Sequence, residues 1–412
     1  MKKWKDLLQA VAVMLVVFGL VFTMTGCGSS GGSSSGDSDQ NTPGSSDTDS
    51  PGEDNEGSDA DAPDASDPST WIDGNTIKVP GEVQKITAEI VDQMGNTIQK
   101  VDMSECLNLT IEGNAFKDVL SLQEVYLPAN VTIQDGSGSN LGRSTVVEGT
   151  FSGCYNLDKV VFVGTGTTNI GKNAFYNCQN LDTVILADTT NVGESAFQYC
   201  TSLKTIQGTE NISSIGEYAF YNCSSLAEMD LNGLQNDLPQ FAFGVCSELT
   251  SVVLPDRSMN ILEDAFYNCP KLKDINLEKV ASIGERAFRQ CTSLQIADLQ
   301  SIVHLGLGAF KQSGLTYIRF SDSVKSVASD ALATAADKVY VYYGTGVETE
   351  AQLIERLNQV ENWEYCGLFY NDNDVEHTKI DGVLSFNQWE SDMAVIKDLM
   401  KANQSLAGWF TF

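Results

Sequence analysis

The sequence predicts an α/β solenoid of about ten coils, with a parallel β-sheet on one face, short helical or 3-10 turns opposite, and a cap at each end. Two observations predict this fold class. A phenylalanine returns every 22 to 24 residues over much of the chain, apart from one gap of 35, and similar small, aliphatic and cysteine residues surround each one. Self-similarity at such a period indicates repeats that each form one supersecondary unit and complete one another's core.

Residues 1–26 predict an export signal. A basic start, "MKKWK", precedes an apolar run of signal-peptide length that ends at small residues. The segment from Met24 to Cys27 resembles the lipobox of bacterial lipoproteins, although that family prefers leucine where Met24 stands. The resemblance implies cleavage before Cys27 and a diacylglycerol on its thiol, so Cys27 is the expected lipidation site. The alternative is an uncleaved anchor helix, which would also place the rest of the chain outside the membrane.

Residues 27–70, which begin at the lipidated cysteine, predict a disordered acidic tether. From Gly28 to Thr70 the chain is almost entirely Ser, Gly, Asp, Pro, Asn and Glu, without one Lys or Arg. Such a composition buries too little apolar surface to offset the entropy of ordering. The formal net charge of -30 for the whole chain also argues against nucleic acid or anionic lipid as a partner, because both polyanions favour Lys and Arg.

The repeats define a solenoid over residues 111–338. The marker positions are Phe116, Phe151, Phe175, Phe197, Phe220, Phe243, Phe266, Phe288, Phe310 and Leu332. An aliphatic residue stands five positions before every marker, and the constant offset predicts that it faces the core. These residues are Ile111, Val146, Ile170, Val192, Ile215, Leu238, Ile261, Ile283, Leu305 and Val327. A glycine follows in half of the units, where we expect a turn that needs permissive backbone angles.

After the marker the repeat continues as C-x-x-L-x-x-[IV]-x-L, for example from Cys178 to Leu186. Its last positions have the L-x-x-L-x-L spacing of a leucine-rich repeat strand, which packs its aliphatics inward. The repeat pattern I-G-x-x-A-F-x-x-C-x-x-L-x-x-I-x-L-P resembles the BspA-like leucine-rich repeat family of bacterial surface proteins over residues 111–337. The resemblance implies a curved leucine-rich repeat solenoid used for adhesion and protein recognition, and it implies no particular ligand.

Seven cysteines recur once per coil at one position and predict a column of buried thiols. They are Cys154, Cys178, Cys200, Cys223, Cys246, Cys269 and Cys291. Equivalent β-carbons on adjacent in-register coils lie about 4.8 Å apart and point the same way, whereas a disulfide needs them about 3.8 Å apart and facing each other. Each thiol is therefore interpreted as a small apolar core filler. Some disulfides, or a metal ladder, are the alternatives, although the sequence has no C-x-x-C cluster.

One departure from the repeat marks candidate partner-binding residues on the sheet. At the exposed strand position before the final aliphatic, the first coils carry Tyr126, Val161 and Ile185, whereas later coils are mostly polar or charged. Contiguous exposed apolar side chains on a rigid sheet indicate a protein contact. The alternative is β-propensity alone, because Tyr, Val and Ile are favoured in strands.

A second departure is the long gap, which inserts about twelve residues before Phe151. Solenoid insertions map to loops on one face, so Asp135, Asn140 and Arg143 are candidate contacts. A neutral surface insertion is the alternative. Tyrosines that directly follow a marker are expected to line one flank, either as a glycan or partner platform or as a consequence of repeat duplication: Tyr176, Tyr221 and Tyr267.

The ends of the solenoid need caps, because terminal coils would otherwise expose core to water. Residues 71–110 predict the N-terminal cap, in which residues 98–103 alternate as a strand should. Residues 339–412 predict a C-terminal cap and a flanking helical segment, with a strand at "KVYVYY" and helices over 349–360 and 388–402. The part from residue 364 onward could alternatively form a separate small module.

The sequence predicts no enzyme activity, cofactor or metal site. The acidic cluster from Asn371 to Glu376 lacks the glycine and the closing carboxylate of an EF-hand loop. Neither His304 nor His377 lies in a recognisable nucleophile context. We therefore expect a non-enzymatic protein on the extracellular face of the bacterial cell envelope, attached to the membrane only through its lipid. Its expected partner is a protein, extracellular-matrix or cell-surface ligand, and a structural spacer without a specific ligand is the alternative.

Overall fold

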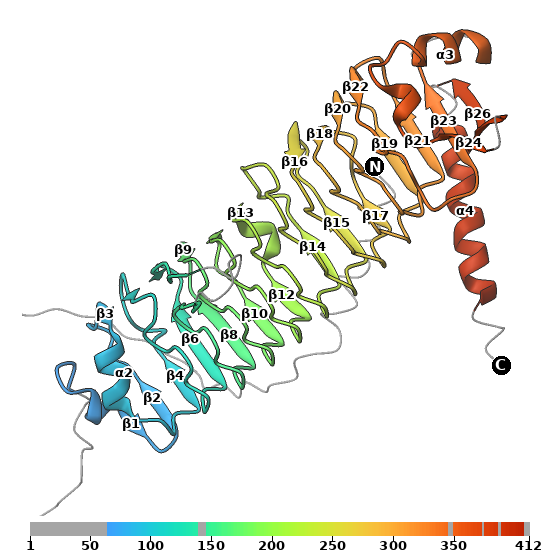
Figure 1. Ribbon diagram of the computed structural model, residues 1–412. Helices are drawn as coiled ribbons and strands as arrows, with labels where there is room; N and C mark the ends of the chain where they lie inside the picture. The colour runs from blue at the N-terminus through green and yellow to red at the C-terminus, as the bar shows by residue number, and fades with distance from the viewer. Residues whose placement is uncertain (1–63, 139–145, 345–348, 373–374, 386–388, 408–412) are drawn as a thin grey trace, which may run out of the picture. The chain divides into compact units, whose positions relative to one another are not determined.

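The chain winds through successive coils that stack on one another (Figure 1). This computed structural model describes residues 64–138, 146–344, 349–372, 375–385 and 389–407, all within one unit. Most coils contribute a strand to each of two columns of parallel strands and close with a turn segment at the marker phenylalanine. The predicted parallel solenoid is thereby confirmed. Cys27 and the predicted export signal lie outside the described residues.

The first column of strands comes from the L-x-x-[IV]-x-L segments, as the spacing predicted. The column consists of three sheets, which end at β12, β17 and β26; within each sheet neighbouring strands pair in parallel, except that β1 is antiparallel to β2. The strands are β1 (Ile72–Asp73), β2 (Thr76–Lys78), β4 (Lys100–Asp102), β6 (Glu124–Pro128), β8 (Lys159–Val163), β10 (Thr183–Ile185), β12 (Thr205–Gln207), β14 (Glu228–Asp230), β15 (Ser251–Val253), β17 (Asp274–Ile275), β19 (Ile296–Leu299), β21 (Tyr317–Phe320), β23 (Val339–Tyr343) and β26 (Ile380–Ser385).

A second column of parallel strands, which the sequence analysis did not predict, precedes the markers. Its strands are β3 (Lys85–Ile86), β5 (Thr110–Ile111), β7 (Thr132–Ile133), β9 (Thr167–Ile170), β11 (Thr189–Val192), β13 (Ile212–Ile215), β16 (Met259–Ile261), β18 (Val280–Ile283), β20 (His304–Leu305) and β22 (Ser326–Val327). A short 3-10 helix, η2 (Thr209–Asn211), leads into β13. The aliphatic residue five positions before the marker is buried here, with one exception.

The exception is Val146, which the prediction placed in the core and which is 69% exposed. Its expected place is taken by Ile133, which is 1% exposed and pairs in register with Ile111 and Ile170. The insertion follows this strand rather than preceding it. The residue five positions before Phe151 therefore lies after the insertion, so the constant offset selected Val146 instead of Ile133.

The repeated glycines serve a different purpose from the one expected. Gly171, Gly193, Gly216, Gly284 and Gly306 are not among the residues with positive φ, so the prediction of permissive angles is wrong for them. A β-carbon on any of the five would lie 2.4–2.8 Å from backbone of the preceding coil. Glycine is needed because adjacent coils approach each other closely at this corner.

The turn segments alternate local and inter-coil hydrogen bonds. Around Phe175, the residues two before and two after it, Asn173 and Asn177, have left-handed φ of 59° and 61°. The N–H of Cys178 donates to the carbonyl of Phe175, an i→i+3 bond, while the N–H of Phe175 donates to Ala196 of the next coil at 2.8 Å. The segments opposite the sheet are therefore single turns with an inter-coil ladder of their own.

The marker phenylalanines form one continuous stack through the interior. From Phe116 to Phe310, neighbouring ring centroids are 4.9–5.6 Å apart, and their planes differ by 15° or less. Each ring is at most 1% exposed. Such pairs stabilise the fold by about 0.5–1.5 kcal/mol each beyond the burial of their area.

The seven ladder cysteines lie beside this stack as free, fully buried thiols. Each Sγ donates to the carbonyl oxygen of the marker phenylalanine one coil earlier, at 3.0–3.2 Å. Burial raises the pKa of Cys154 and of Cys269 to about 12. The ladder thiols are thus donors that link adjacent coils as well as small core residues.

The folded part begins earlier than the tether prediction placed it. Asp67 caps the 3-10 helix η1 (Pro68–Trp71), and the indole N–H of Trp71 donates to the carbonyl of Asp64 at 2.7 Å. Helix α2 (Ala88–Met94), capped by Thr87, lies between β3 and β4 where later coils have their turn segment. These elements cover the first coil.

The last coils end in helices and a hairpin. The two predicted helices are present as α3 (Glu350–Leu357) and α4 (Trp389–Ala407). Between them lie η3 (Trp363–Tyr365) and the hairpin β24 (Phe369–Asp372) and β25 (Val375–Thr378), and β26 then pairs in parallel with β23. Among the described residues, no helix combines the length and apolarity required to span a bilayer.

Candidate binding surfaces

The three apolar residues predicted on the sheet lie side by side. Tyr126 of β6 is in register with Val161 of β8, and Val161 is in register with Ile185 of β10. All three are partly exposed, and we call them the open row. Gln207 of β12 continues the row, so the apolar part ends there. The structure therefore places these residues together, although it does not test whether they bind a partner.

Two lysines flank Tyr126 in a way that the sequence analysis missed. The Nζ of Lys100 lies 4.3 Å from the ring centroid and that of Lys159 lies 5.7 Å from it, both within cation–π range. The phenol of Tyr126 donates to Glu124 at 3.0 Å. Val163, at the end of β8, is 42% exposed and adds to the apolar surface of this face. Strand alternation could have identified these neighbours, since Glu124, Lys159 and Val163 each lie two residues from an open-row residue on the same strand. Lys100 is the register partner of Glu124.

The described start of the insertion lies in the second column of strands. Asp135 follows β7 in the second column and accepts a hydrogen bond from the backbone N–H of Lys172 at 2.8 Å. The N–H of Gly136 donates to the carbonyl of the same lysine at 2.8 Å. Asp135 thus fastens the start of the insertion to the next coil. Asn140 and Arg143, the other predicted contacts, lie outside the described residues.

At the C-terminal end of the same column of strands, helix α4 covers the outer face of the separate sheet β19-β21-β23-β26. Ile296, Tyr317 and Tyr340 lie in register on β19, β21 and β23. Trp389 and Met393 of α4 pack against them in a hydrophobic cluster separate from the main core. We call this region the covered face. It shows that the outer surface of this sheet can bind an amphipathic helix.

A buried arginine anchors the covered face. Arg319 occupies the same strand position as the open row, yet only 6% of its side chain is exposed. Its guanidinium pairs with Asp298 on the neighbouring strand and with Glu390 of α4, and it lies 5.0 Å from the ring of Trp389. Tyr342 donates to Asp392 of α4 at 3.0 Å, and burial together with that hydrogen bond raises the pKa of Tyr342.

The family model of the BspA type leucine rich repeat region matches residues 72–143, 139–240 and 232–336 of this chain, in six copies. The chain belongs to this BspA-type leucine-rich repeat family. No curated protein matches the sequence at a significant level.

The chain is also similar to several solved structures, among them two leucine-rich repeat proteins and a pneumococcal antigen. One from Bacteroides ovatus is 19% identical, with a TM-score of 0.45, and the match covers 75% of this chain and 84% of that one. The T. pallidum leucine rich repeat protein is 21% identical, with a TM-score of 0.34, covering 54% and 78%. The pneumococcal vaccine antigen PcpA is 16% identical, with a TM-score of 0.35, covering 76% and 79%.

The turn side of this BspA-type solenoid carries a contiguous set of rings. Tyr199 contacts Tyr176 and Tyr221 edge-on, at centroid distances of 5.6 and 5.9 Å, and Tyr218 stacks on Phe241 at 4.8 Å. Tyr221 joins the two groups through contacts of 5.8 Å with Tyr218 and Phe241. We call these five residues the turn-side aromatic cluster. It contains two of the three tyrosines expected on this flank.

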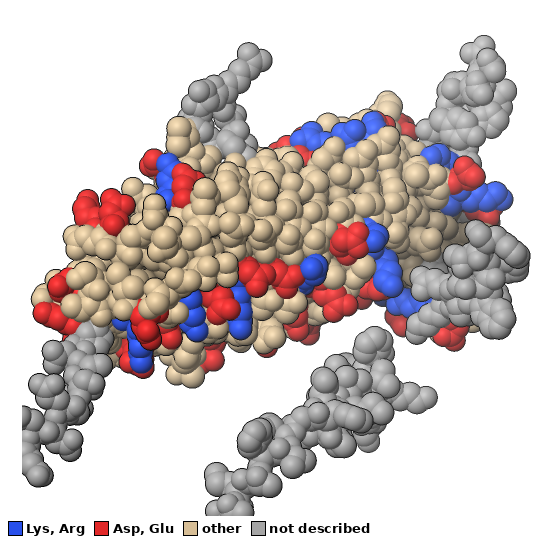
Figure 2. All heavy atoms as spheres, turned by 90° about the horizontal axis from the view of Figure 1, so that it is seen from below, with Lys and Arg blue, Asp and Glu red and all other residues tan. Residues whose placement is uncertain are grey.

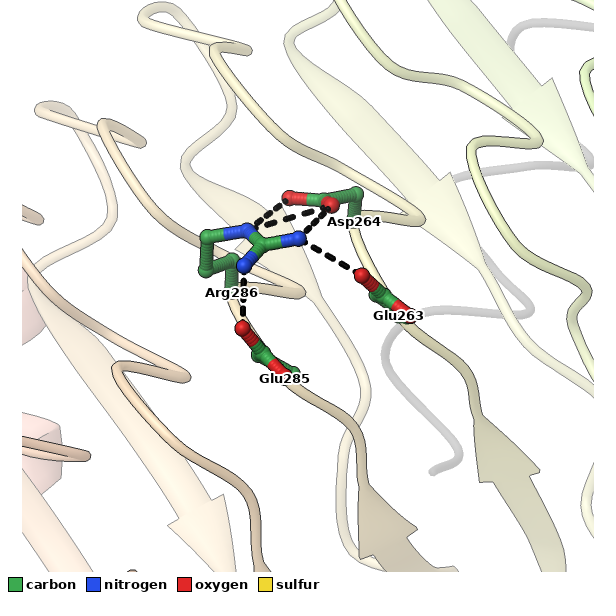
Figure 3. A network of polar contacts seen from close by, with 4 residues as sticks. All are labelled: Glu263, Asp264, Glu285 and Arg286. Atoms are coloured by element: carbon green, nitrogen blue, oxygen red, sulfur yellow. Dashed lines mark hydrogen bonds and ion pairs between the residues drawn. The ribbon is translucent and has the colours of Figure 1, made fainter. Parts of the chain in front are cut away.

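Next to the cluster lies a charged network centred on Arg286 (Figure 3). Its guanidinium binds Asp264 through two nitrogens, the shortest contact being 2.7 Å, binds Glu263 at 2.6 Å and also pairs with Glu285. Asp264 is 2% exposed. The hydrogen bond with Asp264 and the charges of the surrounding carboxylates raise the pKa of Arg286. Three carboxylates around one guanidinium leave a surplus of negative charge.

Elsewhere on the surface, many acidic and basic side chains lie next to one another. Figure 2 shows a broad uncharged band bordered by acidic and basic residues that lie next to one another. Many of these pairs join adjacent coils, as Lys204 does with Asp182 at 2.8 Å and Lys271 with Glu248 at 2.6 Å. Within the described part of the chain, no cluster of three or more His, Cys, Asp or Glu residues is arranged to hold a metal ion.

Proposed function

We propose that this protein is a lipid-anchored, non-enzymatic recognition protein of the bacterial cell surface, and that the open row binds a protein partner or a matrix ligand. Membership of the BspA-type family supports the recognition role. The observation that carries the proposal is that Arg319 and Tyr342, which stand at the same strand position, contact helix α4 on the covered face. The open row repeats that position on β6, β8 and β10 with apolar side chains that are partly exposed.

The partner's chemistry follows from the surroundings of the open row. Its apolar side chains offer a central contact. Lys100 and Lys159 border this contact, because they lie on the strands on either side of Tyr126 and near its ring. Apolar centres with a charged border are typical of protein interfaces. An amphipathic segment with acidic residues along its edges would complement this arrangement, as α4 complements the covered face through Glu390 and Asp392.

The test replaces Tyr126, Val161 and Ile185 with aspartate in the full chain. We expect adhesion to host or neighbouring cells to be lost while the melting temperature stays within a few degrees, because these side chains face solvent on one side. The matched control is Val253→Asp, which adds one charge at the same strand position of β15, where the valine is 43% exposed. Adhesion that persists in the triple variant would contradict the proposal and favour a structural spacer.

The anchor is tested independently. The unmodified chain is expected to incorporate a labelled fatty acid, and replacing Cys27 with alanine is expected to abolish the labelling, because the thiol would carry the lipid. Absence of label from the unmodified chain in the membrane fraction would indicate the uncleaved helix instead.

A further inference from the structure

The turn-side aromatic cluster places bulky residues where the backbone is left-handed. Tyr199, Tyr218 and Phe241 have φ of 65°, 58° and 54°. Equivalent left-handed positions in other coils hold asparagine, as at Asn173 and Asn177, but also serine, aspartate, glutamine, arginine and valine. Asparagine tolerates this conformation far better than aromatic residues do. Because asparagine would relieve the backbone strain at these three positions, the rings are candidates for a role other than folding.

The same rings are accessible. All five members of the cluster are partly exposed, and they cover four consecutive coils from Tyr176 to Phe241. The inter-coil hydrogen bonds beneath them hold the backbone at fixed spacing, as in the 2.9 Å bond from the N–H of Tyr199 to the carbonyl of Tyr221. The cluster is thus a rigid platform of ring faces and edges.

Carboxylates border this platform. Glu217 precedes Tyr218 directly, and the network of Glu263, Asp264 and Glu285 around Arg286 continues the row beyond Phe241. Burial raises the pKa of Tyr218, and the next largest causes are the charges of Glu217 and Asp264, so both carboxylates lie near this ring. The local potential is therefore negative and attracts cations.

Two tyrosine rings elsewhere in the protein have cationic side chains over them. Tyr267, which occupies the same position after its marker as Tyr176 and Tyr221, has the guanidinium of Arg289 at 5.9 Å from its ring centroid. Tyr126 on the sheet has Lys100 at 4.3 Å. Lysine and arginine bind the faces of tyrosine rings, and nearby carboxylates strengthen the attraction.

We propose that the turn-side aromatic cluster is a second binding surface, and that it binds a lysine- or arginine-rich segment of a protein. Cationic side chains rest on the rings of Tyr199, Tyr218 and Phe241, and Glu217 with the carboxylates around Arg286 supplies the opposite charge. This surface lies on the turn side and acts independently of the open row.

The test measures binding of a short, fluorescently labelled peptide of alternating lysine and glycine to the full chain. The variants Tyr218→Asn and Phe241→Asn remove a ring without altering the charge of the protein. Each is expected to weaken binding about tenfold, which corresponds to the loss of a strong cation–π contact. The melting temperature is expected to change by only a few degrees, because the relief of the left-handed backbone offsets part of the stability lost with the ring contacts.

Three controls keep the outcome unambiguous. Tyr218→Phe retains the ring and should bind the peptide within about twofold of the original affinity. Gln312→Asn alters an equivalent left-handed position (φ 60°) in a coil away from the cluster and should change nothing. The same peptide with its lysines acetylated should not bind.

Several results would overturn the proposal. Unchanged affinity in both asparagine variants would mean that the peptide responds only to the general negative charge of the chain. Equal losses in Tyr218→Phe and Tyr218→Asn would exclude a ring-face contact. Binding of a neutral oligosaccharide that depends on these rings, without binding of the lysine peptide, would identify a glycan platform instead.

Discussion

The first column of strands has the same parallel backbone pairing near its two ends, but within the described residues only the C-terminal end has its outer face covered by a helix. At the C-terminal end, the row of Asp298, Arg319 and Tyr342 lies beneath α4, and Arg319 retains only 6% of its side-chain exposure. At the N-terminal end, Tyr126 and Val161 of the open row remain partly exposed. The backbone ladder is parallel and in register in both regions. The choice of side chains, rather than the fold, therefore decides whether the face is occupied.

The covered face also shows what occupation requires. The buried guanidinium has a carboxylate on each side, from Asp298 and Glu390, and Trp389 lies over it. A charge taken out of water is tolerated only when it is paired and hydrogen-bonded. On the open row, the nearby lysines are still partly in water and need no such partner. A ligand that covers them would have to provide one.

The largest effect is expected from Arg319→Ala. The substitution leaves Asp298 buried without its partner and removes the cation beneath Trp389, so it should destabilise the C-terminal coils by about 3–5 kcal/mol. Urea denaturation followed by tryptophan fluorescence measures the loss. The matched substitution on the open face, Lys159→Ala, should cost less than about 1 kcal/mol, because its charge is solvated. Equal losses in the two variants would remove the distinction between the faces.

A somewhat smaller effect is expected from Trp389→Ala. The indole is 4% exposed and forms the centre of the cluster with Tyr342 and Met393, so its removal should cost about 3 kcal/mol and loosen α4. Hydrogen exchange should then accelerate in α4 and β23 but not in β6 or β8, because coils of a solenoid depend mainly on their neighbours. Uniform acceleration along the chain would contradict this local view.

The sequence predicted the interior far better than the covered face. The aliphatic and phenylalanine positions repeat at a constant offset, so burial could be inferred for all of them, and the one error arose where an insertion broke the offset at Val146. Arg319 was interpreted as one of the exposed polar strand residues. Its burial depends on Glu390 and Trp389, some 70 residues further along the chain, and no local pattern encodes that contact.

The two candidate surfaces also differ in how well the sequence predicted them. The alignment of Tyr126, Val161 and Ile185 followed from strand periodicity, because register positions recur once per coil. The turn-side aromatic cluster did not, since Tyr199 and Tyr218 occupy different positions in their repeats, and the cluster forms through Tyr221, which contacts both. The left-handed backbone under them was not predicted either, because the residue at these positions varies between coils, from Asn177 to Val245 and Gln312.

The interior should respond to pH alike behind both faces. The pKa of Cys154, in the coil of the open row, and of Cys269, nearer the covered face, is raised by burial from 9.0 to about 12. The unfolded chain releases these protons near pH 9 while the folded chain retains them, so stability is fully present below pH 9 and falls as pH rises toward 12.

Between pH 7 and pH 10 each thiol should therefore cost the protein about 1.4 kcal/mol. The variants Cys154→Ala and Cys269→Ala should each lose that much less stability over the same interval, whatever their stability at pH 7. Urea titrations at both pH values measure the difference. A pH dependence equal to that of the unmodified chain would show that the thiols ionise freely, contrary to their burial.

The smallest effect is expected from Lys100→Gln on the open face. The ammonium lies 4.3 Å from the ring of Tyr126 and 4.0 Å from Glu124, with 37% of its side chain exposed. Such exposed contacts contribute about 0.5 kcal/mol, so the melting temperature should hardly change. Adhesion should nevertheless weaken if an acidic edge of the partner pairs with this lysine, and the weakening should diminish at high salt. A clear loss of stability would instead mean that the lysine already serves the fold, as Arg319 does beneath α4.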